Sequence, residues 1–236
     1  MRKVNTVIRF LLLACVCGLQ MVFSAALMAA TPGSVLHKLA IPENASLAIV
    51  TSDGLYNGAP IAMATLTSSE PVDSVLSFYR TLWNDGDEQL PGYVESAVNH
   101  QQLISRMRDG LNIVFQLEST GENTTTGYVS VLALNTPQVT EDHGVFSDLE
   151  SLSSHRTVDG ADTSWMRVYA SPASVNRTRE LYLQRLGSNG WHVLADHEVQ
   201  GVWVTHLSRS ASRLELTFLD SREYASMVVA HRVDSE

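Results

Sequence analysis

The sequence predicts an α+β fold of two tandem, similar modules, each with one helix packed on an antiparallel sheet of about four strands, after an N-terminal signal or anchor segment. Three observations lead to this prediction. Residues 70–83 have the pattern of an amphipathic helix, and the pattern returns in altered form at residues 171–186. Runs of alternating polar and apolar residues follow both helices. Matching positions lie at a nearly constant offset of 103 residues.

The first helix is indicated by its start signals and by its apolar face. Ser69 can cap the helix, and Glu70 and Pro71 suit its first turn, where an acid meets the helix dipole and a proline loses no hydrogen bond. Because a helix has 3.6 residues per turn, one face then collects the apolar side chains. These are Val72, Val75, Leu76, Tyr79 and Trp83.

The strands are indicated by alternation and by turn residues. Residues 111–117 alternate clearly, and they follow Asp109-Gly110, a pair typical of tight hairpin turns. Residues 52–60 and 119–127 are rich in Gly, Asn, Asp and Thr, which predicts loops. Residues 31–52 are interpreted as a lead-in. Further strands are expected at residues 47–50, 61–67 and 128–134.

The second half of the chain repeats this plan. A polar stretch with a proline at residues 135–142 is interpreted as a linker between a first module, 31–134, and a second, 143–236. A helix on an antiparallel sheet resembles, in its plan, the helix-grip modules of some envelope assembly proteins. The offset of 103 pairs Met63 with Met166, Val72 with Val175, Tyr79 with Tyr182, Leu111 with Leu214 and Phe115 with Phe218.

Residues 1–30 have the composition of an export signal. Basic residues open the segment, and an almost wholly apolar run follows from residue 10 to residue 30. Ser24-Ala25-Ala26 places small residues where signal peptidases cut. Two alternatives stay open, namely lipidation at Cys15 and retention of the run as a membrane anchor. The sequence therefore predicts a periplasmic or secreted protein that meets the membrane only through residues 1–30.

Charge and cysteine content narrow the classes of partner. The chain has 16 basic and 25 acidic residues and a formal net charge of −9. The first 30 residues hold three basic and no acidic residues, so the remainder carries −12. Nucleic acids and anionic membrane surfaces are disfavoured as partners of such a chain. Both cysteines, Cys15 and Cys17, lie in the signal, so the remainder has no disulfide or thiol chemistry.

No pattern of catalytic, cofactor-binding or metal-binding residues is predicted. Histidines are scattered, and the closest pair, His192 and His197, would face opposite sides of a regular strand. Residues 84–88 carry oxygen ligands but lack the spacing of a calcium loop. No Gly-x-Ser-x-Gly or glycine-rich phosphate loop occurs. The other histidines are His37, His100, His143, His155, His206 and His231.

The aromatic residues divide into core and surface candidates. The tryptophans Trp83, Trp165 and Trp203 are expected to pack in cores with Tyr79. Tyr56, Tyr93 and Tyr128 stand beside predicted loops, where a binding edge is conceivable.

These features favour a non-enzymatic protein of the cell envelope that acts as a binding or assembly adaptor for a protein partner. A small-molecule or lipid carrier with a pocket between helix and sheet is the alternative. A hydrolase with an unrecognised site is a third hypothesis.

The signal interpretation predicts the mass of the exported protein. Cleavage after the small residues at 24–26 removes both cysteines, so intact-mass spectrometry of the chain from the envelope fraction should give an unmodified protein that lacks the apolar run. A mass equal to that of the full chain would show an uncleaved anchor instead. A chain that begins at a lipid-modified Cys15 would show lipidation.

Overall fold

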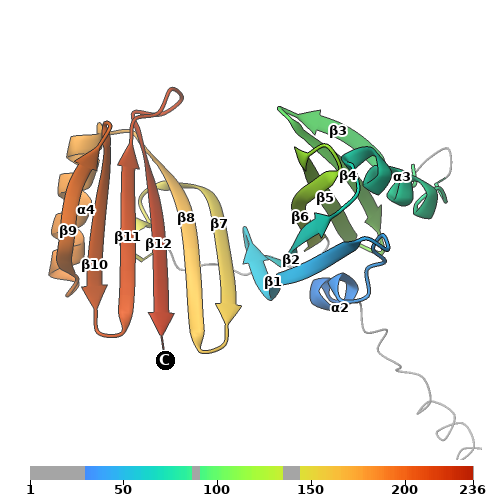
Figure 1. The fold of residues 1–236 in the computed structure, drawn as a ribbon. Helices are drawn as coiled ribbons and strands as arrows, with labels where there is room; N and C mark the ends of the chain where they lie inside the picture. The colour runs from blue at the N-terminus through green and yellow to red at the C-terminus, as the bar shows by residue number, and fades with distance from the viewer. Residues whose placement is uncertain (1–29, 87–90, 135–143, 236) are drawn as a thin grey trace, which may run out of the picture. The chain divides into compact units, whose positions relative to one another are not determined.

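The computed structural model describes residues 30–86, 91–134 and 144–235, and within them one large antiparallel sheet dominates. Its twelve strands lie in the order β3-β4-β5-β6-β2-β1-β7-β8-β12-β11-β10-β9. Figure 1 shows the strands and the helices that accompany them. The prediction of two separate helix-on-sheet modules with about four strands each is therefore wrong. The predicted linker at 135–142 and the segment 1–29 lie outside the described residues.

The elements follow one another in two similar series. The first series consists of α2 (Pro32–Leu36), β1 (Ala45–Tyr56), β2 (Ala59–Ser68), α3 (Val72–Leu82), β3 (Val94–Val98), β4 (Gln101–Arg108), β5 (Leu111–Gly121) and β6 (Thr124–Ala133). The second consists of the 3₁₀ turn η1 (Gly144–Phe146), β7 (Glu150–Asp159), β8 (Asp162–Ser171), α4 (Val175–Ser188), β9 (His192–Val199), β10 (Val202–Arg209), β11 (Ser212–Leu219) and β12 (Ser226–Ser235).

Each series contributes six strands because segments predicted as lead-in or loop are extended. The lead-in and the loop at 52–60 form β1 and the start of β2, joined by the two-residue turn Asn57-Gly58. Both turn residues have positive φ, 48° and 76°, as an Asn-Gly hairpin turn requires. The predicted loop at 119–127 is the tip of the β5–β6 hairpin, where threonine, a β-branched residue, continues the strands.

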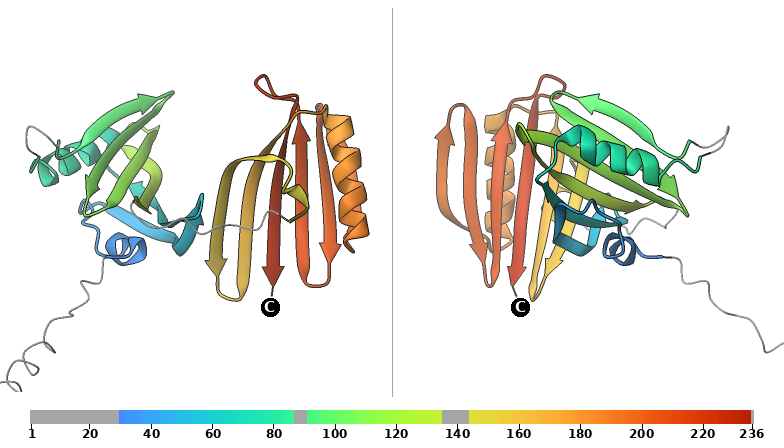
Figure 2. Two further views of the ribbon diagram at one scale, coloured as in Figure 1. Left: turned by 180° about the vertical axis from the view of Figure 1, so that it is seen from behind. Right: turned by 45° about the vertical axis from the view of Figure 1, so that its right-hand side comes forward.

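Both predicted helices are confirmed. The predicted apolar face of α3 is buried, and the ring of Tyr79 lies 4.0 Å from that of Phe115 on β5, centroid to centroid. The Tyr79 hydroxyl donates to the carbonyl of Ala40 at 3.1 Å. In α4 the ring of Tyr182 lies 5.0 Å from that of Phe146. Figure 2 shows α4 lying along one face of the second-series strands, while the opposite face of these strands carries no helix.

The repeat in the sequence corresponds to the same strand order on both sides of the sheet, but its offset changes along the chain. Val72 and Val175 open the two helices at the predicted offset of 103. Beyond the helices, the strand registers align Phe115 with Leu216 rather than with Phe218. The offset there is 101, because the two series differ in helix length and in the connection to the next strand. A shift of two residues keeps the alternation, which is why the sequence pattern did not reveal it.

The two series meet where β1 pairs with β7. Leu55 lies opposite Arg156, and Tyr56 lies opposite His155. Asn57 extends the contact, because its backbone N–H donates to the carbonyl of Ser154 and its side-chain oxygen accepts from the N–H of Ser154, both at 2.8 Å. A Cβ on Gly54 would lie 3.0 Å from the Arg156 carbonyl oxygen, so a glycine there permits the close approach of β7. We call these residues the β1–β7 joint.

Replacing Asn57 by glycine should weaken this joint. The variant Asn57→Gly keeps a residue that tolerates positive φ but removes the acceptor for the Ser154 N–H, at a cost of about 0.5–1.5 kcal/mol in unfolding free energy. Asn99→Gly is the matched control, since Asn99 also has positive φ, 56°, in the β3–β4 turn. Urea unfolding of both variants measures the difference. Equal destabilisation of both would contradict the role given to the Asn57 side chain.

His155 should make the joint sensitive to acid. Burial lowers the pKa of His155 below its ordinary value of 6.5, and its Nε2 is buried with no hydrogen-bond partner in the described part of the chain. Arg156 follows it in the chain, Met166 lies opposite on β8 and the ring of Tyr56 contacts it edge-on. Because the folded state disfavours the charged imidazole, its contribution to stability is complete above pH 6.5 and is lost as the pH falls below that value.

Amide hydrogen exchange, corrected for intrinsic rates, tests this between about pH 7.5 and pH 5.5. The amides of Asn57 and Ser154 should lose protection at the acid end, and His155→Phe should abolish the change. His100→Phe is the control, because the His100 side chain is largely exposed in the β3–β4 turn. Unchanged protection in the unmodified chain would sink the prediction.

Candidate functional site

The two outermost strands of the sheet, β3 and β9, are its largest exposed features. All five residues of β3 and all eight of β9 are exposed. Each strand is the last in the order, so one of its sides presents backbone N–H and C=O groups that no neighbouring strand pairs (Figure 1). Such an edge can accept an additional strand from another chain.

The longer edge, β9, presents large apolar side chains to solvent. Val193, Leu194 and Val199 are exposed by 51%, 66% and 52%. Leu194 is the extra residue of a β-bulge, because Val193 pairs with Leu207 while Ala195 pairs with the adjacent His206. The regular stretch that remains for strand addition is 195–199.

An arginine from the neighbouring helix holds each edge strand. On β9, Asp196 forms an ion pair with Arg179 of α4 and accepts from the Thr205 hydroxyl at 2.8 Å. On β3, Glu95 pairs with Arg80 of α3 at 2.6 Å, and the hydrogen bond from this guanidinium lowers the pKa of Glu95. These contacts order the edges before any partner arrives, which reduces the entropy cost of binding.

The bulge also changes the placement of the two closest histidines. His192 lies opposite Ser208 and His197 opposite Val204, so both occupy the sheet face that α4 leaves uncovered. The expectation of opposite faces held only for a regular strand. The His197 ring stacks at 6.0 Å on His206, which contacts Glu215 at 3.4 Å.

Metal and catalytic constellations are not assembled in the described residues. No group of three or more His, Cys, Asp or Glu side chains within 30–86, 91–134 and 144–235 could hold a metal ion. Ser164 and His231 share a hydrogen bond of 2.9 Å, but both lie inside paired strands, where the ladder engages the backbone N–H groups that an oxyanion hole needs. His143 lies outside the described residues.

The described part of the acidic stretch after α3 forms ion pairs within the protein. Asp85 forms ion pairs with Arg106 at 2.7 Å and with Arg108 at 2.9 Å. A calcium ion would have to displace both guanidinium groups from this carboxylate. Residues 87–88 of the stretch lie outside the described part.

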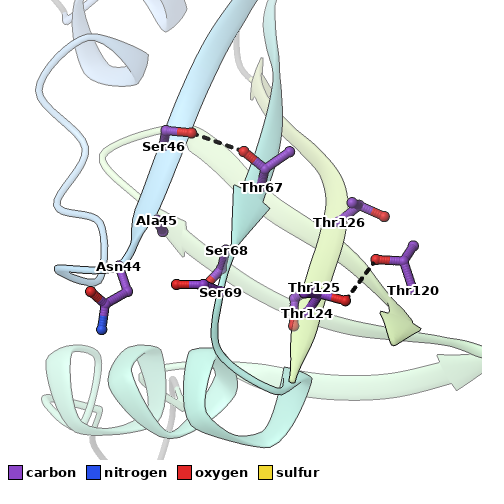
Figure 3. Close-up of a pocket in the computed structure, with 10 residues that line it drawn as sticks. All are labelled: Asn44, Ala45, Ser46, Thr67, Ser68, Ser69, Thr120, Thr124, Thr125 and Thr126. Carbon is purple, nitrogen blue, oxygen red and sulfur yellow. Dashed lines mark hydrogen bonds between the residues drawn. The ribbon is translucent and has the colours of Figure 1, made fainter. Parts of the chain in front are cut away.

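A hollow lined by hydroxyl side chains lies near the start of α3, and Figure 3 shows it. Ser46 and Thr67 bond to each other at 2.8 Å, and Thr120 donates to Thr124 at 3.3 Å. Thr125 turns its hydroxyl to the carbonyl of Glu70 at 2.7 Å. Because these groups satisfy one another, the hollow offers few free donors to a ligand. Its lining also includes Asn44, Ala45, Ser68, Ser69 and Thr126.

The aromatic side chains separate differently from the prediction. Trp83 and Tyr79 are core, as expected, whereas Trp165 and Trp203 are only half-buried. The three tyrosines beside predicted loops do not gather at one place. Tyr56 lies at the β1–β7 joint, Tyr93 packs against the first core, and Tyr128 is exposed on β6.

In the described part of the chain, no helix is both long enough and apolar enough to cross a bilayer. Comparison of the chain with models of protein families, with curated proteins and with solved structures gives no match.

Proposed function

We propose that this chain is a non-enzymatic, exported protein of the cell envelope that binds an extended segment of a partner protein along β9. The observation that carries the proposal is the exposed β9 edge, in which a regular run of backbone groups is flanked by apolar side chains. A strand added beside 195–199 would pair its backbone with the edge. Its side chains would cover Val199, which removes apolar surface from water.

The charge of the chain favours a basic partner segment. Beyond residue 30 the protein carries an excess of twelve acidic charges, and β9 itself adds Glu198 beside the already paired Asp196. Opposite charge speeds the encounter of two proteins and disfavours like-charged competitors. An apolar, lysine- or arginine-bearing extended segment therefore fits this edge best.

The packing of the first core argues against a carrier with a ligand pocket between α3 and the sheet. Between α3 and the sheet, the side chains of Tyr79, Phe115 and Leu117 are fully buried, and the rings of Trp83 and Phe115 lie 5.8 Å apart. A carrier would need a cavity of several hundred Å³ at that place. The rings of Tyr79, Trp83 and Phe115 occupy that place.

Site-specific photo-cross-linking in the cells that export the protein tests the proposal. A photoreactive residue at position 197 should cross-link to one envelope protein, and mass spectrometry should map the product to an extended, basic segment of it. The same residue at position 107 is the control, since Met107 is 57% exposed on the inner strand β4.

Lysines on the edge should abolish the contact. Leu194→Lys combined with Val199→Lys replaces two exposed side chains, so the fold is retained while addition of a basic strand is blocked. Cross-linking should fall about tenfold or more, whereas Val94→Lys combined with Val98→Lys on β3 should leave it unchanged. Equal cross-linking from position 107, a product with a second copy of this chain, or insensitivity to the β9 lysines would overturn the proposal.

A further inference from the structure

A cleft of about 600 Å³ opens between the C-terminal end of α4, the turn η1 and the sheet of the second series. Its volume lies within the range of small-molecule sites. Aromatic rings and guanidinium groups alternate around it. The residues that carry the argument are Trp165, Trp191, Arg167, Arg209, Arg232 and Asp234.

The described residues that precede the strands differ between the two series. In the first series, helix α2 lies on β1, β2 and β6, and Leu36 from it is 1% exposed in the core. In the second, the three-residue turn η1 precedes the strands and supplies Phe146 to the core. Among the described residues, η1 precedes the strands as α2 does in the first series, and it lines the cleft.

The side chains that line the cleft differ in kind from their counterparts in the first series. The strand registers align Ala62, Ala64, Val131 and Ala133 of the first series with Trp165, Arg167, Arg232 and Asp234 of the second. All four first-series residues are small, apolar and buried. The four second-series residues are large or charged and line the cleft. The first-series residues serve to pack a core. The second-series residues combine polar groups with an aromatic ring, as small-molecule binding sites do.

The guanidinium groups are held over aromatic rings. Arg209 lies 4.8 Å above the ring of Trp191, and Arg232 lies 5.9 Å from the same ring. Arg167 lies 4.8 Å above Trp165. The contact with Trp191 orients the guanidinium groups of Arg209 and Arg232, and the N–H donors at the edge of a stacked guanidinium can still meet a ligand.

The arginines of the cleft differ in their partners among the described residues. Asp234 accepts from Arg232 at 2.8 Å and from the Ser212 hydroxyl at 2.5 Å, so it already serves two donors. Arg209 donates to the carbonyl of Asn189 at 3.4 Å and has no carboxylate partner among the described residues. Arg209 and Arg232 therefore face one described acid, Asp234, in a chain with a net charge of −9. A local positive site in an acidic protein favours an anion.

We propose that this cleft binds a small organic anion with a flat apolar body and a carboxylate, sulfonate or phosphate group. The anionic group would receive forked hydrogen bonds from Arg209 and Arg232, and the flat body would lie against Trp165 and Trp191. The site is independent of the β9 edge, because none of the six residues named above belongs to β9.

The fluorescent anion 8-anilino-1-naphthalenesulfonate is a suitable probe, since it combines a sulfonate with aromatic rings. It should bind the full chain once, with Kd on the order of tens of micromolar, and more weakly at high salt. 2-Naphthoate should displace it, whereas the neutral 2-naphthamide should not. Equal displacement by both compounds would refute the requirement for an anion.

Two single substitutions locate the site. Arg209→Gln and Arg232→Gln should each weaken binding of the probe about tenfold or more, because each removes a charge-assisted contact. Arg177→Gln is the matched control, since its side chain is 72% exposed on the outer face of α4, and it should bind as the unmodified chain does. Circular dichroism checks that each variant is folded, and Arg209→Lys, which keeps the charge but not the fork, should give an intermediate affinity. No binding, or equal binding by all folded variants, would overturn the proposal.

Discussion

The sheet depends on one short contact, the β1–β7 joint. Two opposed residue pairs and two hydrogen bonds of Asn57 connect two series of six strands. The joint also decides which edges remain open. Because β1 and β7 contact each other, the outermost strands are β3 and β9, and they lie at opposite ends of the strand order. A sheet closed elsewhere would expose different strands and therefore different side chains to a partner.

The two series share one strand order but differ in the side chains at some corresponding positions. Both place a tyrosine of the helix at the centre of a core, and both tie an outer strand to the helix by an arginine and a carboxylate. They differ at the end of the sheet that α2 covers in the first series. There, alanine and valine in one series correspond to tryptophan, arginine and aspartate in the other. Side chains on a fully paired ladder can change in this way because the backbone hydrogen bonds that hold the strands do not involve them.

Local patterns predicted the helices, and the Asp109-Gly110 turn is confirmed by its positive φ values of 52° and 75°. These features depend on residues within a few positions of one another. The predicted count of strands is too low because residues 52–60, although polar, belong to β1, β2 and the Asn57-Gly58 turn between them. The strand order, the joint and the cleft arise from contacts between distant segments, such as Asn57 with Ser154, which no local pattern contains. The offset of 103 already aligns Ala62 with Trp165 in the sequence. Only the folded structure shows that Ala62 is buried in a core whereas Trp165 lines a cleft.

A common use of arginine connects these parts. After residue 30 the chain has one lysine, Lys38, and all its other basic residues are arginines. Each of the four tryptophans has an arginine over its ring. The arginine over Trp83 also pairs with Asp85, and the arginine over Trp203 also pairs with Asp196. The charge of each of these two stacked arginines is therefore neutralised. At Trp191 the stacked Arg209 has no carboxylate partner in the described residues. An arginine stacked on a tryptophan therefore places a positive charge in the open cleft at Trp191. An anion from solution can pair with this charge, as a carboxylate does at Trp83 and Trp203.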